Sequence, residues 1–203
     1  MATIAEIGLY NYLVSKNTPG LQDTISHFTL KKGAQLYGTP QRFTNIYEII
    51  SGAVKLGRLS PEGKECVYEI VSPGEFFGNL AFLPDAPFNE FSKTLTATEV
   101  RSYDLHFFKY TMTHDPEVAE WFYTRLVSRW NKTESLLYSI RSYEPRKRIT
   151  MLQSNMHRKI MTAVRREVFL DKLISNKDMA DLTATTRQLV ADTFKSSLQL
   201  HME

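Results

Sequence analysis

The chain has 203 residues, of which 42% are hydrophobic and 23% charged, a balance typical of a soluble globular protein with a sizeable core. Its single cysteine, Cys66, excludes a disulfide framework and a cysteine-based zinc or iron–sulfur site. The sequence contains no apolar run as long as a membrane span, and its first residues lack the basic start of a signal peptide. A cytoplasmic protein with no membrane partner is therefore expected.

The net charge of +3 is concentrated in the last third of the chain. Residues 1–108 hold 9 Lys and Arg against 11 Asp and Glu, whereas residues 145–203 hold 11 against 6. Such a basic excess is often only solvated. If it accompanies a helical hairpin that can enter DNA, it is the charge pattern expected of a phosphate-binding face.

The first hundred residues predict one helix followed by β-structure. Residues 3–14 form an amphipathic pattern with apolar side chains at helical spacing: Ile4, Ile7, Tyr10 and Leu13. From residue 21 the chain consists of short runs rich in Val, Ile, Tyr, Phe and Thr, separated by glycine-marked turns. The segment SPEG, ending at Gly63, predicts a hairpin turn. This spacing favours an antiparallel sandwich or closed roll over a parallel sheet.

A long helix is predicted after the β-structure. Asp115 and Pro116 provide a cap and a first-turn proline ahead of a helical run from residue 117 to about 141. Side chains recur along it at spacings of three and four, which predicts a heptad seam: Ala119, Phe122, Leu126, Arg129, Thr133, Leu136 and Ile140. The seam is the expected contact of a parallel dimer, and the alternative is packing on the chain's own sheet. Glu144 and Pro145 then break the helix and form a candidate hinge.

Three further elements are expected between the hinge and the C-terminus. Residues 146–157 start another helix, and residues 167–173 are compatible with either strand or helix. Residues 174–198 predict two short helices around a tight turn. The first is expected to be capped at Ser175, with Met179 and Leu182 facing inward. The second is expected to be capped at Thr185.

The second of these helices carries the candidate DNA-reading residues. Its inner side holds Leu189, Val190 and Phe194, so that the polar side chains face outward. Arginine pairs bidentately with guanine and glutamine with adenine in the major groove, which suits an exposed helix start. The expected base-reading residues are Thr186, Arg187 and Gln188, and the expected phosphate contacts are Ser175, Lys177, Thr185 and Lys195. The alternative is an ordinary helical hairpin with a solvated polar face.

Four segments in this order and spacing resemble the Crp/Fnr superfamily of cyclic-AMP-receptor-like regulators: IYEIISGAVKL, SPEGKECVYEIVSPGEFFGNLAFL, the sequence from His114 to Pro116, and ISNKDMADLTATTRQLVADTFK. The resemblance implies an α+β fold with an N-terminal antiparallel β-roll of the cyclic-nucleotide-binding type. It implies an effector-sensing roll at residues 1–115, a dimerisation helix and hinge at 116–144, and a helix-turn-helix DNA-binding domain at 145–203. Double-stranded DNA and a second copy of the chain are the expected partners, and RNA polymerase is a further candidate.

The sequence departs from the cyclic-nucleotide members of the family. Their Gly-Glu-Leu turn is Gly78-Asn79-Leu80 here, and no arginine lies in the segment 89–93, where Glu90 would repel a phosphate. The expected effector is therefore a small molecule other than cyclic AMP, and no cofactor or metal is expected. Its pocket is expected between the roll and the long helix, at Gly78, Asn79, Leu80, Ser92, Lys93, Arg129 and Thr133. An effector there would shift the dimer helices near Arg129 and Thr133. The alternative is a pocket filled by side chains.

Two further departures concern the C-terminal segment. The usual turn glycine of the helix-turn-helix is Ala184, which costs on the order of 1 kcal/mol if the position is left-handed. The family's β-hairpin wing beyond the second helix is expected to be absent or truncated. These features leave a second interpretation open, namely a ligand-binding regulatory module that does not bind DNA specifically. No nucleophile motif, phosphate-binding loop or paired histidines predicts an enzyme.

Overall fold

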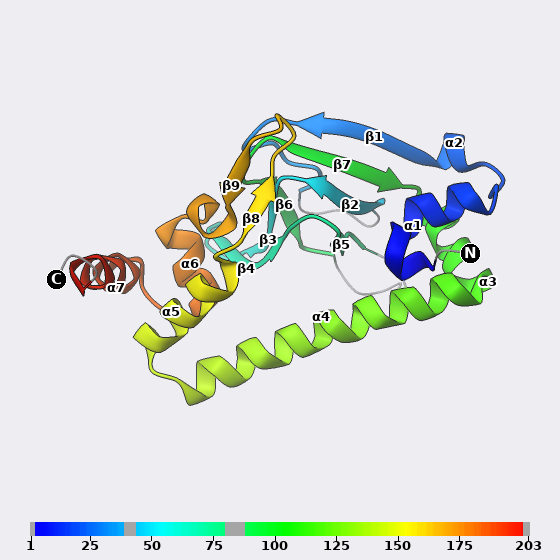
Figure 1. The fold of residues 1–203 in the computed structure, drawn as a ribbon. Helices are drawn as coiled ribbons and strands as arrows, with labels where there is room; N and C mark the ends of the chain where they lie inside the picture. The colour runs from blue at the N-terminus through cyan, green and yellow to red at the C-terminus, as the bar shows by residue number, and fades with distance from the viewer. Residues whose placement is uncertain (1–2, 39–43, 80–87, 201–203) are drawn as a thin grey trace.

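The computed structural model describes residues 3–38, 44–79 and 88–200, with side chains up to residue 196. A β-roll occupies the middle of the molecule, with the N-terminal helices at one end and the C-terminal helices at the other (Figure 1). One long helix, α4 (Pro116–Ser142), runs along the whole length between these two ends. The two groups of helices therefore cover different parts of the same roll.

The roll consists of two antiparallel sheets, in the orders β1-β7-β2-β5 and β4-β3-β6. Strongly apolar side chains such as Ile49, Leu56 and Val100 are completely buried between them. The turn between β3 and β4 has Gly63 at φ +76°, a conformation that favours glycine, as predicted. The predicted antiparallel roll is confirmed. Its strands are β1 (Ile25–Leu30), β2 (Ile46–Ser51), β3 (Val54–Leu59), β4 (Glu65–Val71), β5 (Phe76–Phe77), β6 (Phe91–Thr94) and β7 (Thr98–Tyr103).

Helices α1 (Ile4–Ser15), α2 (Leu21–Thr24) and α3 (Leu105–His114) lie at the N-terminal end of the roll. The predicted first helix is confirmed, but Gly8 interrupts it at φ +79°. The fully buried side chains beyond this kink are therefore Leu9, Tyr12 and Leu13. They pack with Phe108 and with Trp121 at the start of α4.

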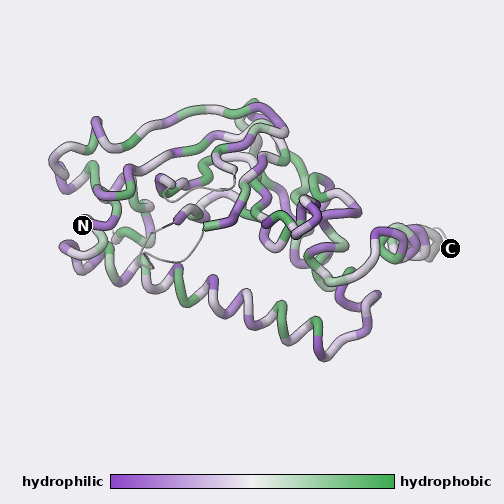
Figure 2. The backbone as a smooth tube through the Cα atoms, turned by 180° about the vertical axis from the view of Figure 1, so that it is seen from behind, coloured by the Kyte–Doolittle hydropathy of each residue, from purple (hydrophilic) through white to green (hydrophobic). Residues whose placement is uncertain are grey.

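The long helix begins at the predicted cap. The Asp115 carboxylate accepts hydrogen bonds from the backbone amides of Glu117 and Val118. Only Val118 and Trp121 are buried in α4, and hydrophobic and hydrophilic residues alternate along the rest of its length (Figure 2). Beyond Phe122 the helix is therefore mostly exposed, and its half-buried side chains there are Arg129, Leu136, Ser139 and Ile140.

The C-terminal segment begins with α5 (Pro145–Met156), directly after the predicted break. A short hairpin follows, formed by β8 (Lys159–Met161) and β9 (Glu167–Phe169). The 3-10 helix η1 (Leu170–Leu173) continues from β9, so the segment 167–173 combines strand and helix. Helices α6 (Asn176–Thr183) and α7 (Arg187–Leu200) complete the predicted helix-turn-helix.

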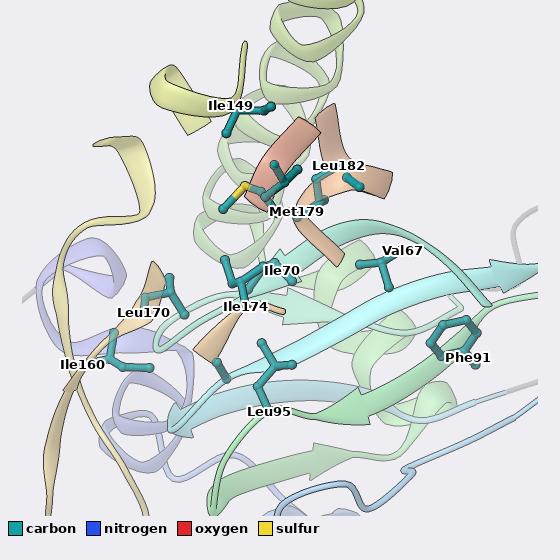
Figure 3. Close-up of a cluster of buried hydrophobic side chains, with 13 residues drawn as sticks. Val67, Ile70, Phe91, Leu95, Ile149, Ile160, Leu170, Ile174, Met179 and Leu182 are labelled. Carbon is teal, nitrogen blue, oxygen red and sulfur yellow. The ribbon is translucent and has the colours of Figure 1, made fainter. Parts of the chain in front are cut away.

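The C-terminal segment and the roll share one hydrophobic core. Val67 and Ile70 of β4 belong to the same buried cluster as Met179 and Leu182 of α6. Figure 3 shows the two pairs next to each other, with no other element between them. Met179 is 1% exposed. Two backbone hydrogen bonds also join the parts, from Gly52 N to Met161 O (2.7 Å) and from Ala163 N to Ala97 O (3.0 Å). Helix α6 is therefore fixed to the outer face of the sheet β4-β3-β6.

We predict that Met179→Ala lowers the free energy of unfolding by about 2–5 kcal/mol, because it opens a cavity in this shared core. Met151→Ala in α5 is the matched control, since Met151 is 38% exposed and its loss is expected to cost about 0.5 kcal/mol or less. Chemical denaturation of both variants provides the measurement. Equal effects for the two variants would contradict a tightly packed contact between α6 and the roll.

Candidate DNA interface and effector pocket

The tight turn predicted between the two C-terminal helices lies at Ala184. Ala184 caps α6 in the left-handed region, at φ 50° and ψ 51°. The Ser175 hydroxyl accepts a hydrogen bond from the amide of Asp178 at the start of α6, which confirms the predicted cap. The cap predicted at Thr185 is wrong, because the Thr186 hydroxyl accepts from Leu189 N (3.2 Å). The Thr185 hydroxyl instead shares a hydrogen bond with that of Thr183.

The first residues of α7 form an exposed polar surface. The side chains of Thr186, Arg187 and Gln188 are exposed, whereas Val190 on the opposite side is fully buried in the shared core. Gln188 Nε2 donates to Asp192 Oδ1 (2.9 Å), which orients its amide along the helix. Helix α7 lies at the end of the molecule farthest from the N-terminus (Figure 1). The predicted base-reading residues are thus brought together on an accessible helix start.

The four predicted phosphate contacts differ in their environments. Lys195 is exposed, and Thr185 is half-buried. Ser175 uses its hydroxyl within α6, donating to Asp178 Oδ2 (2.8 Å). The Lys177 ammonium donates to Glu65 O of the roll (2.5 Å) and to Asp181 Oδ2 (2.7 Å). In this arrangement Lys177 therefore contacts the roll.

A buried ion pair that the sequence did not predict joins α6 to the roll. Lys55 Nζ of β3 lies 2.9 Å from Asp178 Oδ1 and 3.3 Å from Glu65 Oε2. Burial opposes the charge of Lys55, but Asp178 and Glu65 raise the pKa of this ammonium above its ordinary value. Asp181 Oδ2 also accepts from Val67 N (3.0 Å). These contacts depend on the register of α6 against β3 and β4, for which the sequence gives no local signal.

A cavity of about 140 Å³ lies between the roll and α4. Arg129 Nη2 contacts Glu69 Oε2 (2.6 Å) across it, and Lys132 Nζ contacts Glu75 Oε1 (3.3 Å). Burial opposes the charge of Arg129, but the Glu69 and Glu90 carboxylates raise the pKa of its guanidinium. Aromatic and apolar side chains complete the wall: Ile46, Phe76, Phe77, Phe122 and Leu126. The cavity thus combines an apolar wall with paired charges.

Glu90 lies inside the roll, where it is 6% exposed. The hydroxyls of Tyr37 and Tyr68 each donate a hydrogen bond to one of its carboxylate oxygens. Burial and the adjacent Glu90 carboxylate raise the pKa of both tyrosines well above its ordinary value, so both hydroxyls remain protonated donors at neutral pH. Both oxygens of this buried carboxylate therefore have hydrogen-bond donors, and the carboxylate adds negative charge to the interior of the roll.

Two of the predicted effector residues, Gly78 and Arg129, line the cavity. Ser92 is fully buried, and its hydroxyl bonds to the backbone of Tyr37. Lys93 pairs with Glu65 (3.3 Å), near the α6 contact, and does not line the cavity. Thr133 is exposed and bonds to Arg129 O of its own helix. The amide of Asn79 donates to the Thr44 hydroxyl (2.7 Å), and Leu80 lies outside the described residues.

The predicted dimer seam is divided between two sides of α4. Phe122 is half-buried and packs on Phe108 (ring centroids 5.8 Å apart). Leu136 and Ile140 are also half-buried, whereas Leu126 and Thr133 are exposed. The most exposed large apolar side chains of α4 are different ones, and most of them lie one position after a predicted seam residue: Tyr123, Val127, Trp130, Leu137 and Tyr138. Tyr123 and Val127 also line a shallow groove on the outer side of the helix.

Neither a metal-binding cluster nor a membrane-spanning helix occurs among the described residues. No group of three or more His, Cys, Asp or Glu side chains there is arranged to hold a metal ion. Among the same residues, no helix combines the length and hydrophobicity needed to span a membrane.

Comparison with known proteins agrees with this architecture. Residues 27–115 match the cyclic nucleotide-binding domain. The chain is 25% identical over 134 residues to the "CRP-like cAMP-activated global transcriptional regulator" of Mycobacterium tuberculosis, a match that covers 66% of this chain. It spans about 60% of the length of that relative.

Solved structures of the same fold include FixK2 from Bradyrhizobium japonicum, with a TM-score of 0.69 and 18% identity over 88% of this chain and 85% of that one. A Crp/Fnr-family regulator from Eubacterium rectale has a TM-score of 0.68 and 15% identity, covering 96% and 87% of the two chains. With its β-roll, long helix and helix-turn-helix, the chain thus has the fold of these solved structures, and its residues 27–115 match the cyclic nucleotide-binding domain.

Proposed function

We propose that this chain is a DNA-binding transcription regulator that acts as a homodimer in the cytoplasm, and that its role is regulatory and not catalytic. The observation that carries the proposal is the exposed start of α7, where Thr186, Arg187 and Gln188 face solvent while α6 is anchored in the core. The basic excess of residues 145–203 supports it, because phosphate contacts require positive charge. RNA polymerase is a further partner consistent with this role.

The proposed division of labour follows the three parts of the chain. Residues 1–115 would sense an effector, residues 116–144 would hold two copies together, and residues 145–203 would bind DNA. Lys177 and Ser175 would contact phosphate, together with Thr185 and Lys195. Lys177 would first have to exchange its contact with the Glu65 carbonyl for one with DNA.

The proposed dimer seam uses the exposed apolar face of α4. Tyr123, Val127, Trp130 and Leu137 recur with spacings of four, three and seven, which is the heptad pattern of a coiled coil. Trp130 Nε1 donates to Glu134 Oε1 (2.6 Å), which holds the indole along this face. The predicted seam would then lie beside this apolar face, and some of its residues would be turned toward the roll. Its residues are Phe122, Leu126, Thr133, Leu136 and Ile140. Two such helices would place the two α7 helices about one turn of DNA, roughly 34 Å, apart.

The proposed effector site is the cavity next to Arg129. A ligand that enters it would compete with Glu69 for the guanidinium, and so could move α4 relative to the roll. Cyclic AMP is not the proposed ligand, for two reasons. Asn79 replaces the glutamate of the cyclic-nucleotide members, and Glu90 is a buried carboxylate that would repel a phosphate. The ligand-binding alternative without DNA recognition shares this cavity, so the DNA experiments below distinguish the two interpretations.

We predict that Arg187→Ala relaxes the preference at one base pair, at a cost of about 1–3 kcal/mol on the preferred duplex. Selection of bound duplexes from a random pool identifies the preferred sequence, and binding of both proteins to single-base variants gives the free energies. Lys195→Ala is the control, since loss of a phosphate contact weakens all duplexes alike. A pool without an enriched motif would favour the ligand-binding alternative.

We predict that Trp130→Ala weakens dimerisation by about 2 kcal/mol or more, because an exposed tryptophan at the centre of the proposed seam is a typical interface hot spot. Tyr110→Ala on α3 is the matched control, since Trp130 and Tyr110 are both 64% exposed. Sedimentation equilibrium measures the dimer dissociation constant of each protein. A monomeric parent chain, or equal effects of the two substitutions, would rule out this seam.

We predict that calorimetric titration with cyclic AMP gives no saturable binding. The Glu90 carboxylate repels a phosphate inside the roll, and Lys93 pairs with Glu65 away from the cavity. A thermal-shift series with the same nucleotide is an independent readout, since any ligand of the folded state raises the unfolding temperature. Saturable binding together with a thermal shift would show that cyclic AMP is an effector after all.

A further inference from the structure

Arg148 in the first turn of α5 connects three segments that meet at the hinge. It is 9% exposed, and its guanidinium makes three hydrogen bonds to backbone carbonyls. Nη1 donates to Ile140 O (2.8 Å) in the last turns of α4 and to Tyr143 O (3.2 Å) directly after it. Nη2 donates to Ala184 O (3.1 Å) in the turn of the helix-turn-helix. One side chain thus joins the end of the long helix to the residue that separates α6 from α7.

The chemistry of these acceptors suits a guanidinium. The last carbonyls of a helix lack partners within the helix and carry partial negative charge, which attracts a cation. Ala184 is in the left-handed conformation, where alanine is strained, and a donor on its carbonyl helps to fix the direction of that peptide. The planar fork of arginine can serve acceptors on two sides at once, whereas a lysine ammonium is a single point.

The arrangement is not the one expected if the residue served stability alone. Arg148 Nε is buried and has no hydrogen-bond partner among the described residues, which carries a desolvation cost. Its three acceptor residues are half-buried or exposed, so water could reach their carbonyls if the side chain were apolar. An apolar replacement of similar length is therefore expected to leave the folded state intact.

We propose that Arg148 is a positioning residue that couples α4 to the recognition helix, so that a shift of α4 is transmitted to the turn at Ala184 and hence to α7. The inference rests on the proposed DNA-reading role of α7. Helix α7 starts three residues after Ala184, and its first residues are the proposed base readers. A change in the direction of the Ala184 peptide would therefore move those side chains directly.

The test compares Arg148→Met and Arg148→Lys with the control Arg146→Met, which removes an exposed cation from the same helix. Spin labels are attached through Ser142→Cys at the end of α4 and Ser196→Cys on α7, both exposed, in a Cys66→Ser background. Labelled chain is diluted with excess unlabelled chain, so that pulsed electron resonance reports only distances within one chain. Circular dichroism and the unfolding temperature confirm that each variant is folded.

The coupling predicts a single narrow distance distribution in the parent and in Arg146→Met, and a broad one in Arg148→Met. Arg148→Lys is also expected to broaden it, because one ammonium cannot serve both Ile140 and Ala184. If Arg148→Met does not fold, Arg148→Lys alone decides the matter. Distributions as narrow as the parent's in every folded Arg148 variant would overturn the proposal.

Duplex binding by the same variants separates this inference from the proposed function. Arg148→Met is expected to lose affinity for the selected duplex, while Arg146→Met loses only the general contribution of one surface charge. A parent chain that binds no duplex specifically would contradict the DNA-reading role. The distance measurement would still decide whether Arg148 couples α4 to the turn.

Discussion

The structure depends on the burial of α6 against the outer face of the sheet β4-β3-β6. Each fully buried side chain of this size contributes about 1.5–3 kcal/mol, so Met179, Leu182, Val67 and Ile70 together provide a strong contact. The Lys55–Asp178 pair lies at the same contact, with 13% and 5% of the two side chains exposed. A buried pair of this kind adds little net stability, but removal of one partner would leave the other charge buried and unpaired, at a cost of about 3–5 kcal/mol.

This contact divides the C-terminal segment into a fixed side and a free side. Helix α6 is buried, while the first turn of α7 faces solvent at the end of the molecule. A scaffold that holds one helix rigidly and presents the next is what groove reading requires. The same contact occupies Lys177, so the roll and a phosphate would compete for one ammonium. The arrangement therefore provides a physical link between the state of the roll and the proposed DNA contact.

Local patterns in the sequence predict local structure well. The cap at Ser175, the tight turn between α6 and α7 and the start of α4 at Asp115 all depend on a few adjacent residues, and all are found. The cap of α7 was predicted one residue early, because Thr185 and Thr186 are chemically equivalent and only the turn geometry distinguishes them. Gly8 likewise changes the phase of α1 in a way that a periodic pattern cannot show.

Contacts between distant segments could not be predicted in this way. Lys93 was expected beside an effector, but β6 turns it toward Glu65 at the α6 contact. Glu90 was expected to repel a phosphate, but its partners Tyr37 and Tyr68, which come from other parts of the roll, could not be inferred from the sequence. The faces of α4 also depend on how the helix rotates against the roll, which a heptad count alone does not define.

Native-state hydrogen exchange of the α6 amides tests the central claim most directly. If α6 belongs to the same cooperative unit as the roll, its protected amides should exchange only with the global unfolding that also exposes β3 and β4. Equal opening free energies for α6 and these strands are the predicted result. Exchange of α6 through a much lower-energy opening, with the strands still protected, would contradict the account.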